Sequence, residues 1–264
     1  MTRPPPGGAS EWAELPAGRL VFAPDDVGLV PVGATEQHGP HLPTGTDTMI
    51  ASGICARAAA RCGAVVLPAI PIGCSYGHGH SRGTLSLAPE QLAGLIRQYA
   101  EWAAWSGLRR LLFLNAHLGN SAAIGTGTDH LRLHRPDLRV GAREWWGLSP
   151  DLRAAMFAEG PDVHGNRAET AIMLHLAPGL VDLARAPAAD DEDRTAGLVF
   201  RYTTAQLSRT GATGRPSEAT VELGERLVTG AAAALAELVE RGRTERAPIE
   251  PPPDPSPSSW RAHE

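Results

Sequence analysis

Residues 110–115 read Arg-Leu-Leu-Phe-Leu-Asn, an apolar run closed by a polar residue. Such a run predicts a strand buried on both faces, as in the middle of a parallel sheet. Similar runs lie at 27–33, 64–69 and 138–142, with amphipathic stretches between them. This alternation predicts an α/β layered protein with a largely parallel sheet. We expect its helices over residues 47–62, 88–107, 119–134, 166–177 and 217–241.

The two ends differ in composition from the rest of the 264 residues. Residues 1–10 and 243–264 are rich in proline and polar residues, so we expect both to be disordered and residues 11–242 to form one domain. No apolar run is long enough to cross a bilayer, and the three cysteines are too few for a disulfide framework. These features predict a soluble protein of a reducing cytoplasm, with no membrane partner.

The charged residues exclude several classes of function. The net charge is −5, which argues against a nucleic-acid partner or an anionic membrane surface. All 24 basic residues are arginine, because the chain contains no lysine. Schiff-base chemistry, pyridoxal-phosphate attachment and a phosphate-loop lysine are therefore excluded.

The first of four clusters of histidine and carboxylate residues follows the apolar run at 27–33. Glu36 and His38 are two residues apart, so an extended chain turns both to the same side. Asp47 stands where the helix at 47–62 begins, and could be a metal ligand or the N-cap. Together these residues offer oxygen and imidazole ligands to a divalent metal.

The other three clusters occupy residues 75–80, 115–120 and 162–170. The second lies in a glycine-rich loop that could be surface only, whereas the third ends the most apolar run. The fourth enters a helix, where the helix dipole alone could account for Glu169. Five or six nitrogen and oxygen ligands suit two divalent ions about 3.5–4 Å apart and hydrolytic chemistry. The residues that could converge in this way are Glu36, His38, Asp47, His117, His164 and Glu169.

Four motifs resemble those of the creatininase (creatinine amidohydrolase) family over about residues 28–178. They are GATEQHGPHLPTGTDT (33–48), GTLSL (83–87), NAHLGN (115–120) and HGNRAETAIMLHL (164–176). The resemblance implies a three-layer α/β/α sandwich with a mostly parallel sheet. It also implies a metal-dependent amidohydrolase that acts on a small-molecule amide and assembles as a hexamer, a trimer of dimers.

The same resemblance implies two divalent metal ions per chain, drawn from Zn, Mn and Fe. Glu36 and His117 resemble ligands of the first metal, and His38 resembles a ligand of the second. Asp47 resembles the carboxylate that bridges both ions, and Glu169 matches a position that could complete the second site.

The resemblance also assigns a catalytic residue and shows departures from the family pattern. His164 matches the histidine that would protonate the leaving nitrogen after a metal-bound hydroxide attacks the carbonyl. Gly119 stands where creatininase has a metal-binding Glu, which puts the second metal site in question. Arg167 replaces another Glu, and Arg82 lies in the altered segment 81–84. Either arginine could bind a substrate carboxylate or pair with an acid in an oligomer interface.

Three further residues are candidates for binding substrate. His78 lies in the glycine-rich second cluster, and Trp145 and Trp146 follow the run at 138–142. Creatininase closes a tryptophan-bearing loop over its ligand, so the resemblance implies an aromatic lid here. Core or interface packing is the alternative for two adjacent tryptophans.

Several functions fit these patterns. The leading hypothesis is an amidohydrolase that cleaves a cyclic amide or another non-peptide C–N bond. A mycofactocin-type precursor-peptide peptidase, favoured by Arg167, and a formamide hydrolase acting on a formamidopyrimidine nucleotide are alternatives within the family. A non-catalytic, metal-stabilised scaffold stays open because of Gly119.

Overall fold

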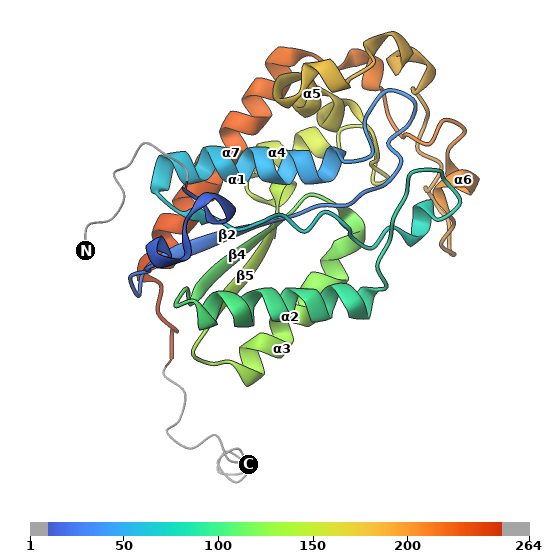
Figure 1. Ribbon diagram of the computed structural model, residues 1–264. Helices are drawn as coiled ribbons and strands as arrows, with labels where there is room; N and C mark the ends of the chain where they lie inside the picture. The colour runs from blue at the N-terminus through green and yellow to red at the C-terminus, as the bar shows by residue number, and fades with distance from the viewer. Residues whose placement is uncertain (1–9, 250–264) are drawn as a thin grey trace.

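The computed structural model describes residues 10–249, in which five parallel strands form one sheet covered by helices on both faces (Figure 1). The strand order β1-β3-β2-β4-β5 puts β2 and β4 inside the sheet. Their apolar sequences suit that place, and all six residues of β2 are buried. The strands are β1 (Ser10–Glu11), β2 (Val27–Val32), β3 (Val65–Val66), β4 (Arg110–Asn115) and β5 (Arg139–Glu144).

Helices form the two outer layers. Helices α1, α5 and α7 pack on one face of the sheet, and α2 and α3 pack on the other (Figure 1). The predicted three-layer α/β/α sandwich is therefore confirmed. The helices are α1 (Thr46–Cys62), α2 (Pro89–Trp105), α3 (Ser121–His134), α4 (Pro150–Met156), α5 (Arg167–Leu176), α6 (Thr204–Leu207) and α7 (Val221–Thr244).

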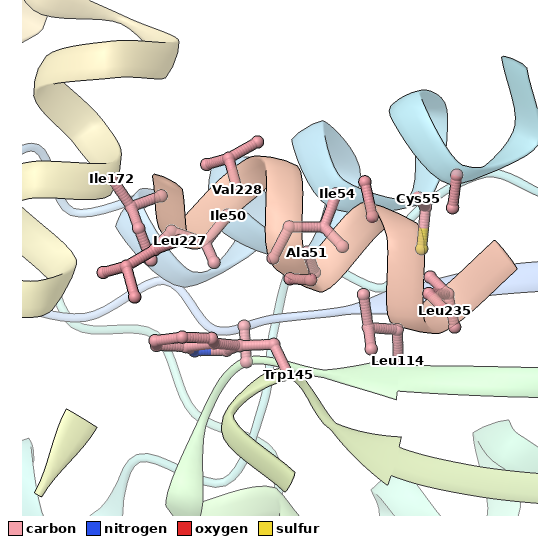
Figure 2. Packing of buried hydrophobic residues seen from close by; sticks show 14 of the residues in the cluster. Ile50, Ala51, Ile54, Cys55, Leu114, Trp145, Ile172, Leu227, Val228 and Leu235 are labelled. Carbon is pink, nitrogen blue, oxygen red and sulfur yellow. The ribbon is translucent and has the colours of Figure 1, made fainter. Parts of the chain in front are cut away.

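Each face of the sheet has its own hydrophobic core. The core under α1, α5 and α7 contains Ile50, Leu114 and Leu235, all of them fully buried (Figure 2). The core on the other face contains Ile96 and Phe113. Each such side chain contributes about 1.5–3 kcal/mol through its removal from water. The two cores fix the sheet in place, and the sheet in turn positions the loops at its carboxyl edge.

Each predicted strand and helix has an observed counterpart with bounds within a few residues, whereas β1, α4 and α6 were not predicted. Ser10, expected to lie in a disordered end, belongs to β1. Strand β3 is shorter than the apolar run at 64–69. Helix α7 continues to Thr244, and buried Arg243 in its last turn donates a 2.7 Å hydrogen bond to the carbonyl oxygen of Cys62. Of the ends predicted to be disordered, residues 1–9 and 250–264 lie outside the described residues. Between residues 10 and 249, no helix is long and apolar enough to cross a membrane.

Candidate metal centre

The four predicted clusters meet at the carboxyl edge of the sheet. Val32 of β2 and Asn115 of β4 are paired in register, so the segments that follow both strands emerge side by side. A pocket of about 190 Å³ opens there. Its lining includes members of every cluster: Asp47, His78, His117, His164 and Glu169.

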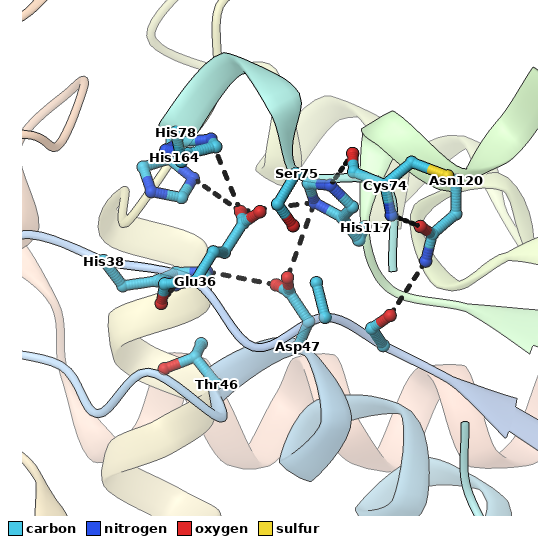
Figure 3. A network of polar contacts seen from close by, with 12 residues as sticks. Glu36, His38, Thr46, Asp47, Cys74, Ser75, His78, His117, Asn120 and His164 are labelled. Atoms are coloured by element: carbon cyan, nitrogen blue, oxygen red, sulfur yellow. Dashed lines mark hydrogen bonds and ion pairs between the residues drawn. The ribbon is translucent and has the colours of Figure 1, made fainter. Parts of the chain in front are cut away.

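Glu36 lies at the centre of this group (Figure 3). Its Oε1 is 3.3 Å from His117 Nδ1 and 3.5 Å from both His78 Nε2 and His164 Nδ1. The side chain is fully buried, and neither oxygen has a partner with hydrogen-bond geometry among the described residues. The buried Ser75 hydroxyl lies beside the carboxylate (Figure 3). A carboxylate so enclosed is costly unless a positive charge compensates it.

Asp47 faces two different imidazoles. Its Oδ1 is 3.1 Å from His38 Nε2, and its Oδ2 is 3.5 Å from His117 Nδ1. The residue lies in the first turn of α1, where the N-cap position is Gly45. The N-cap alternative for Asp47 is therefore wrong. Each of its two oxygens thus lies beside a different imidazole.

Three of the histidines share one arrangement. One ring nitrogen of each lies within hydrogen-bond distance of a backbone carbonyl, which only accepts, so that nitrogen carries the proton. The other nitrogen faces a buried carboxylate, and a histidine held in this way by a backbone carbonyl is typical of metal sites. The pairs are His38 Nδ1 with the Glu36 carbonyl at 3.1 Å, His117 Nε2 with that of Cys74 at 3.1 Å and His164 Nε2 with that of Gln37 at 2.6 Å.

Burial and mutual charge shift the pKa values of the group. Burial raises the pKa of Glu36, and it raises the pKa of Glu169 to about 7. Burial alone would lower the pKa of His38, but the charge of Asp47 outweighs it and raises that pKa to about 10. Burial, followed by the charge of His38, holds the pKa of His164 well below its ordinary value. The site thus favours added positive charge beside its carboxylates.

The donor atoms fit divalent metal ions. Two groups, Glu36–His38–Asp47 and Glu36–His78–His164, each have ligand atoms within 4.8 Å of one another. The set holds carboxylates and imidazoles without thiolate, which suits Zn, Mn or Fe. A cation would satisfy the unpartnered oxygens of Glu36 and the unpartnered Oδ2 of Asp47. The residues present therefore fit a metal centre.

Gly119, the main departure from the family pattern, has a structural reason. A β-carbon at this position would collide with the Cys74 carbonyl oxygen and with the His117 ring. Glu169 is 3% exposed on the same pocket, and its Oε2 accepts a 2.7 Å hydrogen bond from the Gly165 N–H. A carboxylate thus reaches the pocket from α5, whereas no side chain fits at 119.

The expectation of an aromatic lid needs correction. Trp145 and Trp146 are 0% and 3% exposed, and their rings meet edge to face at 5.9 Å. Neither lines the pocket, and both belong to the core under α1, in which Figure 2 shows Trp145. The apolar surface of two indoles is buried more favourably under a helix than over an open pocket.

The two candidate arginines also lie away from the pocket lining. Arg167 Nη1 is 3.4 Å from Glu218 Oε2, and its Nε is 4.0 Å from Glu159 Oε1. Arg82 is exposed. No arginine lines the pocket within the described residues, so substrate-carboxylate binding by Arg167 or Arg82 has no support from the geometry.

Sequence reasoning missed Gln37 and Ser75. The amide nitrogen of Gln37 is 3.0 Å from His78 Nδ1, and Ser75 lies beside Glu36. Strict alternation turns Gln37 away from Glu36 and His38, but β2 ends at Val32 and the chain is irregular beyond it. One feature of the sequence could have indicated Gln37, because it stands between the two candidate metal ligands Glu36 and His38.

Comparison with known proteins identifies the family. The family model described as creatinine amidohydrolase matches residues 10–239. The chain belongs to the creatininase family. It is 37% identical over 194 residues to the creatinine amidohydrolase of Pseudomonas putida, covering 67% of this chain and 74% of that one. It is 34% identical over 212 residues to the mycofactocin precursor peptide peptidase of Mycobacterium tuberculosis, covering 75% and 78%.

Solved structures agree with this family membership. A crystal structure of creatinine amidohydrolase (creatininase) matches with a TM-score of 0.79 and 30% identity, over 90% of this chain and 99% of that chain. Among similar creatininase structures, one is a manganese form and another is a mutant of the Zn–Zn type. This creatininase-family protein is a hydrolase acting on carbon–nitrogen bonds.

Proposed function

We propose that this creatininase-family protein uses two divalent metal ions per chain to hydrolyse a cyclic amide or another non-peptide C–N bond. The observation that supports it best is the inward arrangement of three imidazoles. Each imidazole donates a hydrogen bond from one nitrogen to a backbone carbonyl and turns its other nitrogen toward buried carboxylates. Positive charge beside these enclosed carboxylates makes the arrangement favourable, and divalent cations would supply it.

The first ion would be held by Glu36, His117 and Asp47, and the second by His38, Asp47 and Glu169. The separate contacts of the two Asp47 oxygens with His38 and His117 support a bridging role. Zn, Mn and Fe all suit these ligands. When bound, such ions would polarise the substrate carbonyl and lower the pKa of a water molecule.

His164 would move the proton. Its Nε2–H is held by the Gln37 carbonyl oxygen, which leaves Nδ1 free on the pocket side. As the oxygen of water bonds to the carbonyl carbon, Nδ1 would accept the proton that water loses. The same proton would pass to the nitrogen as the C–N bond breaks, giving a carboxylic acid and an amine.

Formamides stay a candidate substrate class, and two other classes have support from similar proteins. Cyclic amides come first because of the likeness to the Pseudomonas putida creatinine amidohydrolase. Short peptides come second because of the likeness to the Mycobacterium tuberculosis peptidase. Arg167 no longer favours the hypothesis of a peptide substrate, since this side chain pairs with Glu218 outside the pocket lining.

The test begins with elemental mass spectrometry of protein purified without chelators, followed by cyclic amides, formamides and short peptides as substrates. About two ions per chain and turnover of one class are expected. The variant H164A should keep its metal and lose turnover, whereas H130A, at an exposed position on α3, should retain both. Full activity in H164A would remove His164 from the mechanism. Metal binding without any turnover would favour the scaffold alternative.

We also propose a cytoplasmic homohexamer. Exposed Trp102 and Trp105 on α2, 68% and 84% accessible, offer apolar surface for an interface. The three cysteines are unpaired, which suits a reducing compartment. Light scattering after size exclusion should give the mass of six chains, and a monomer mass would contradict the assembly.

A further inference from the structure

The side-chain amide of Gln37 has one favourable orientation. Its Oε1 accepts a 2.9 Å hydrogen bond from the Gly39 N–H, and its Nε2 donates to the Gly211 carbonyl oxygen at 2.7 Å. A flipped amide would set donor against donor at Gly39 and acceptor against acceptor at Gly211. The amide nitrogen therefore points into the site, where it also lies 3.0 Å from His78 Nδ1 and 3.1 Å from His164 Nε2.

Counting protons decides which histidine this amide contacts as a donor. His164 Nε2 carries a proton because it lies 2.6 Å from the Gln37 backbone carbonyl, so it cannot accept another. The amide has two protons. One goes to the Gly211 carbonyl oxygen, and the second goes to His78 Nδ1, which must be unprotonated. The Thr204 hydroxyl lies 3.2 Å from the same nitrogen.

The two histidine rings then differ in what they offer the pocket. They lie with centroids 4.2 Å apart at 39°, and both face Glu36 Oε1 at 3.5 Å. His78 turns a protonated Nε2 to this point and so has no lone pair there for a metal ion, whereas His164 turns an unprotonated Nδ1. One imidazole is thus a donor and its neighbour an acceptor.

We propose that Gln37 is a positioning residue, whose side-chain amide keeps His78 in the Nε2–H tautomer beside the Nδ1 lone pair of His164. This pair suits amide hydrolysis, since the His78 donor can hydrogen-bond to the substrate carbonyl oxygen and the His164 acceptor can take the proton that water loses and pass it to the leaving nitrogen. The catalytic use of the pair rests on the proposed function, but the tautomer itself does not. Gly211 permits the contact, since a β-carbon there would collide with the Gln37 amide.

The variant Q37E tests the tautomer directly. A carboxylate only accepts hydrogen bonds, so His78 should move its proton to Nδ1 and donate to it. Long-range 1H–15N spectra of the zinc-loaded enzyme with 15N-labelled histidine report which ring nitrogen is protonated, and a His78→Asn spectrum assigns the signal. We expect an Nε2–H signal in the wild type, an Nδ1–H signal in Q37E and an unchanged His164 signal in both.

The matched control is Q91E. Gln91 also accepts a backbone hydrogen bond, from the Ala88 N–H at the start of α2, and lies outside the pocket lining. Its histidine spectrum should equal that of the wild type. If Q37E does not fold, Q37L removes the donor without adding charge, and the His78 signal should then report a mixture of tautomers. A wild-type His78 protonated at Nδ1, or a His78 signal that none of the Gln37 variants changes, would overturn the proposal.

Kinetics give an independent readout. With any amide that the wild type turns over, Q37E should lower kcat about 10–100-fold, with a smaller change in KM and unchanged metal content. An unchanged kcat would show that the tautomer does not serve catalysis. If no amide is turned over by the wild type, the proposed function fails, while the spectra still decide the role of Gln37.

Discussion

Gly119 lies against the imidazole of His117, so closely that a β-carbon at 119 would meet both that ring and the Cys74 carbonyl oxygen that accepts its hydrogen bond. The absence of a side chain at 119 is therefore part of how His117 is held. The glycine at 119, which departs from the family pattern, therefore helps to position a candidate ligand of the metal centre.

Replacing Gly119 by Ala should weaken metal binding about 10–100-fold, because the backbone carbonyl of Cys74 cannot move aside without releasing His117. Competition with a chromophoric chelator measures the affinity. The control is G125A in α3, where a β-carbon meets nothing within 4 Å. This control should keep its affinity and gain about 0.5–1 kcal/mol of stability. Equal affinities in G119A and the wild type would contradict the steric account.

Replacing Glu36 by Gln should have opposite effects with and without metal. The change removes a buried charge that lacks hydrogen-bond partners among the described residues, so the chelator-treated variant should be more stable by about 1 kcal/mol. The metal-loaded variant should lose most of the stabilisation that metal gives the wild type. Urea unfolding with and without a chelator measures both effects. The exposed-site control E101Q should change neither, and a chelator-treated E36Q less stable than the wild type would refute the argument.

Replacing Trp145 by Ala should act on stability. The side chain is fully buried, so the cavity should cost about 3–5 kcal/mol in urea unfolding. Metal content should stay unchanged, because Trp145 does not line the pocket. W105A, at an 84% exposed position, should shift stability by less than about 0.5 kcal/mol. A W145A protein with full stability and impaired turnover would restore the lid.

Asp191 should make stability depend on pH. The hydrogen bond from Arg194, together with those from the Arg209 N–H and the Ser208 hydroxyl, holds the pKa of Asp191 well below 3.8. Its contribution is thus complete above about pH 4 and is lost as pH falls through the lowered pKa. D191N should cost about 2 kcal/mol at pH 7, and less than half of that at the lowest pH where both proteins fold. A cost that does not change with pH, measured by urea unfolding, would exclude this carboxylate as the cause.

The control for this pH series is D182N. Asp182 forms an exposed pair with Arg185 at 3.2 Å, and such surface pairs contribute about 0–1 kcal/mol. Its stability should follow that of the wild type at every pH.

Much of the architecture could be predicted because its causes are local. The apolar run at 110–115 is the inner strand β4, and the amphipathic stretches became helices with boundaries close to those expected. The place of the clusters also followed, since the carboxyl ends of parallel strands share one edge. The sequence could not predict which side chains after these strands turn away from the pocket. Trp145 and Trp146 follow β5 as a lid would, but they pack under α1.

The layered fold and the set of metal-ligand candidates follow from the amino-acid sequence, because periodicity and motif depend on neighbours along the chain. The contacts through which those residues act depend on tertiary packing. Gln37 contacts His78 and Gly211, far from it in sequence. The ion pair of Arg167 with Glu218 likewise joins distant segments. Such contacts depend on distances of a few ångströms between separate loops. Packing of the two cores sets these distances, so a local sequence pattern cannot predict them.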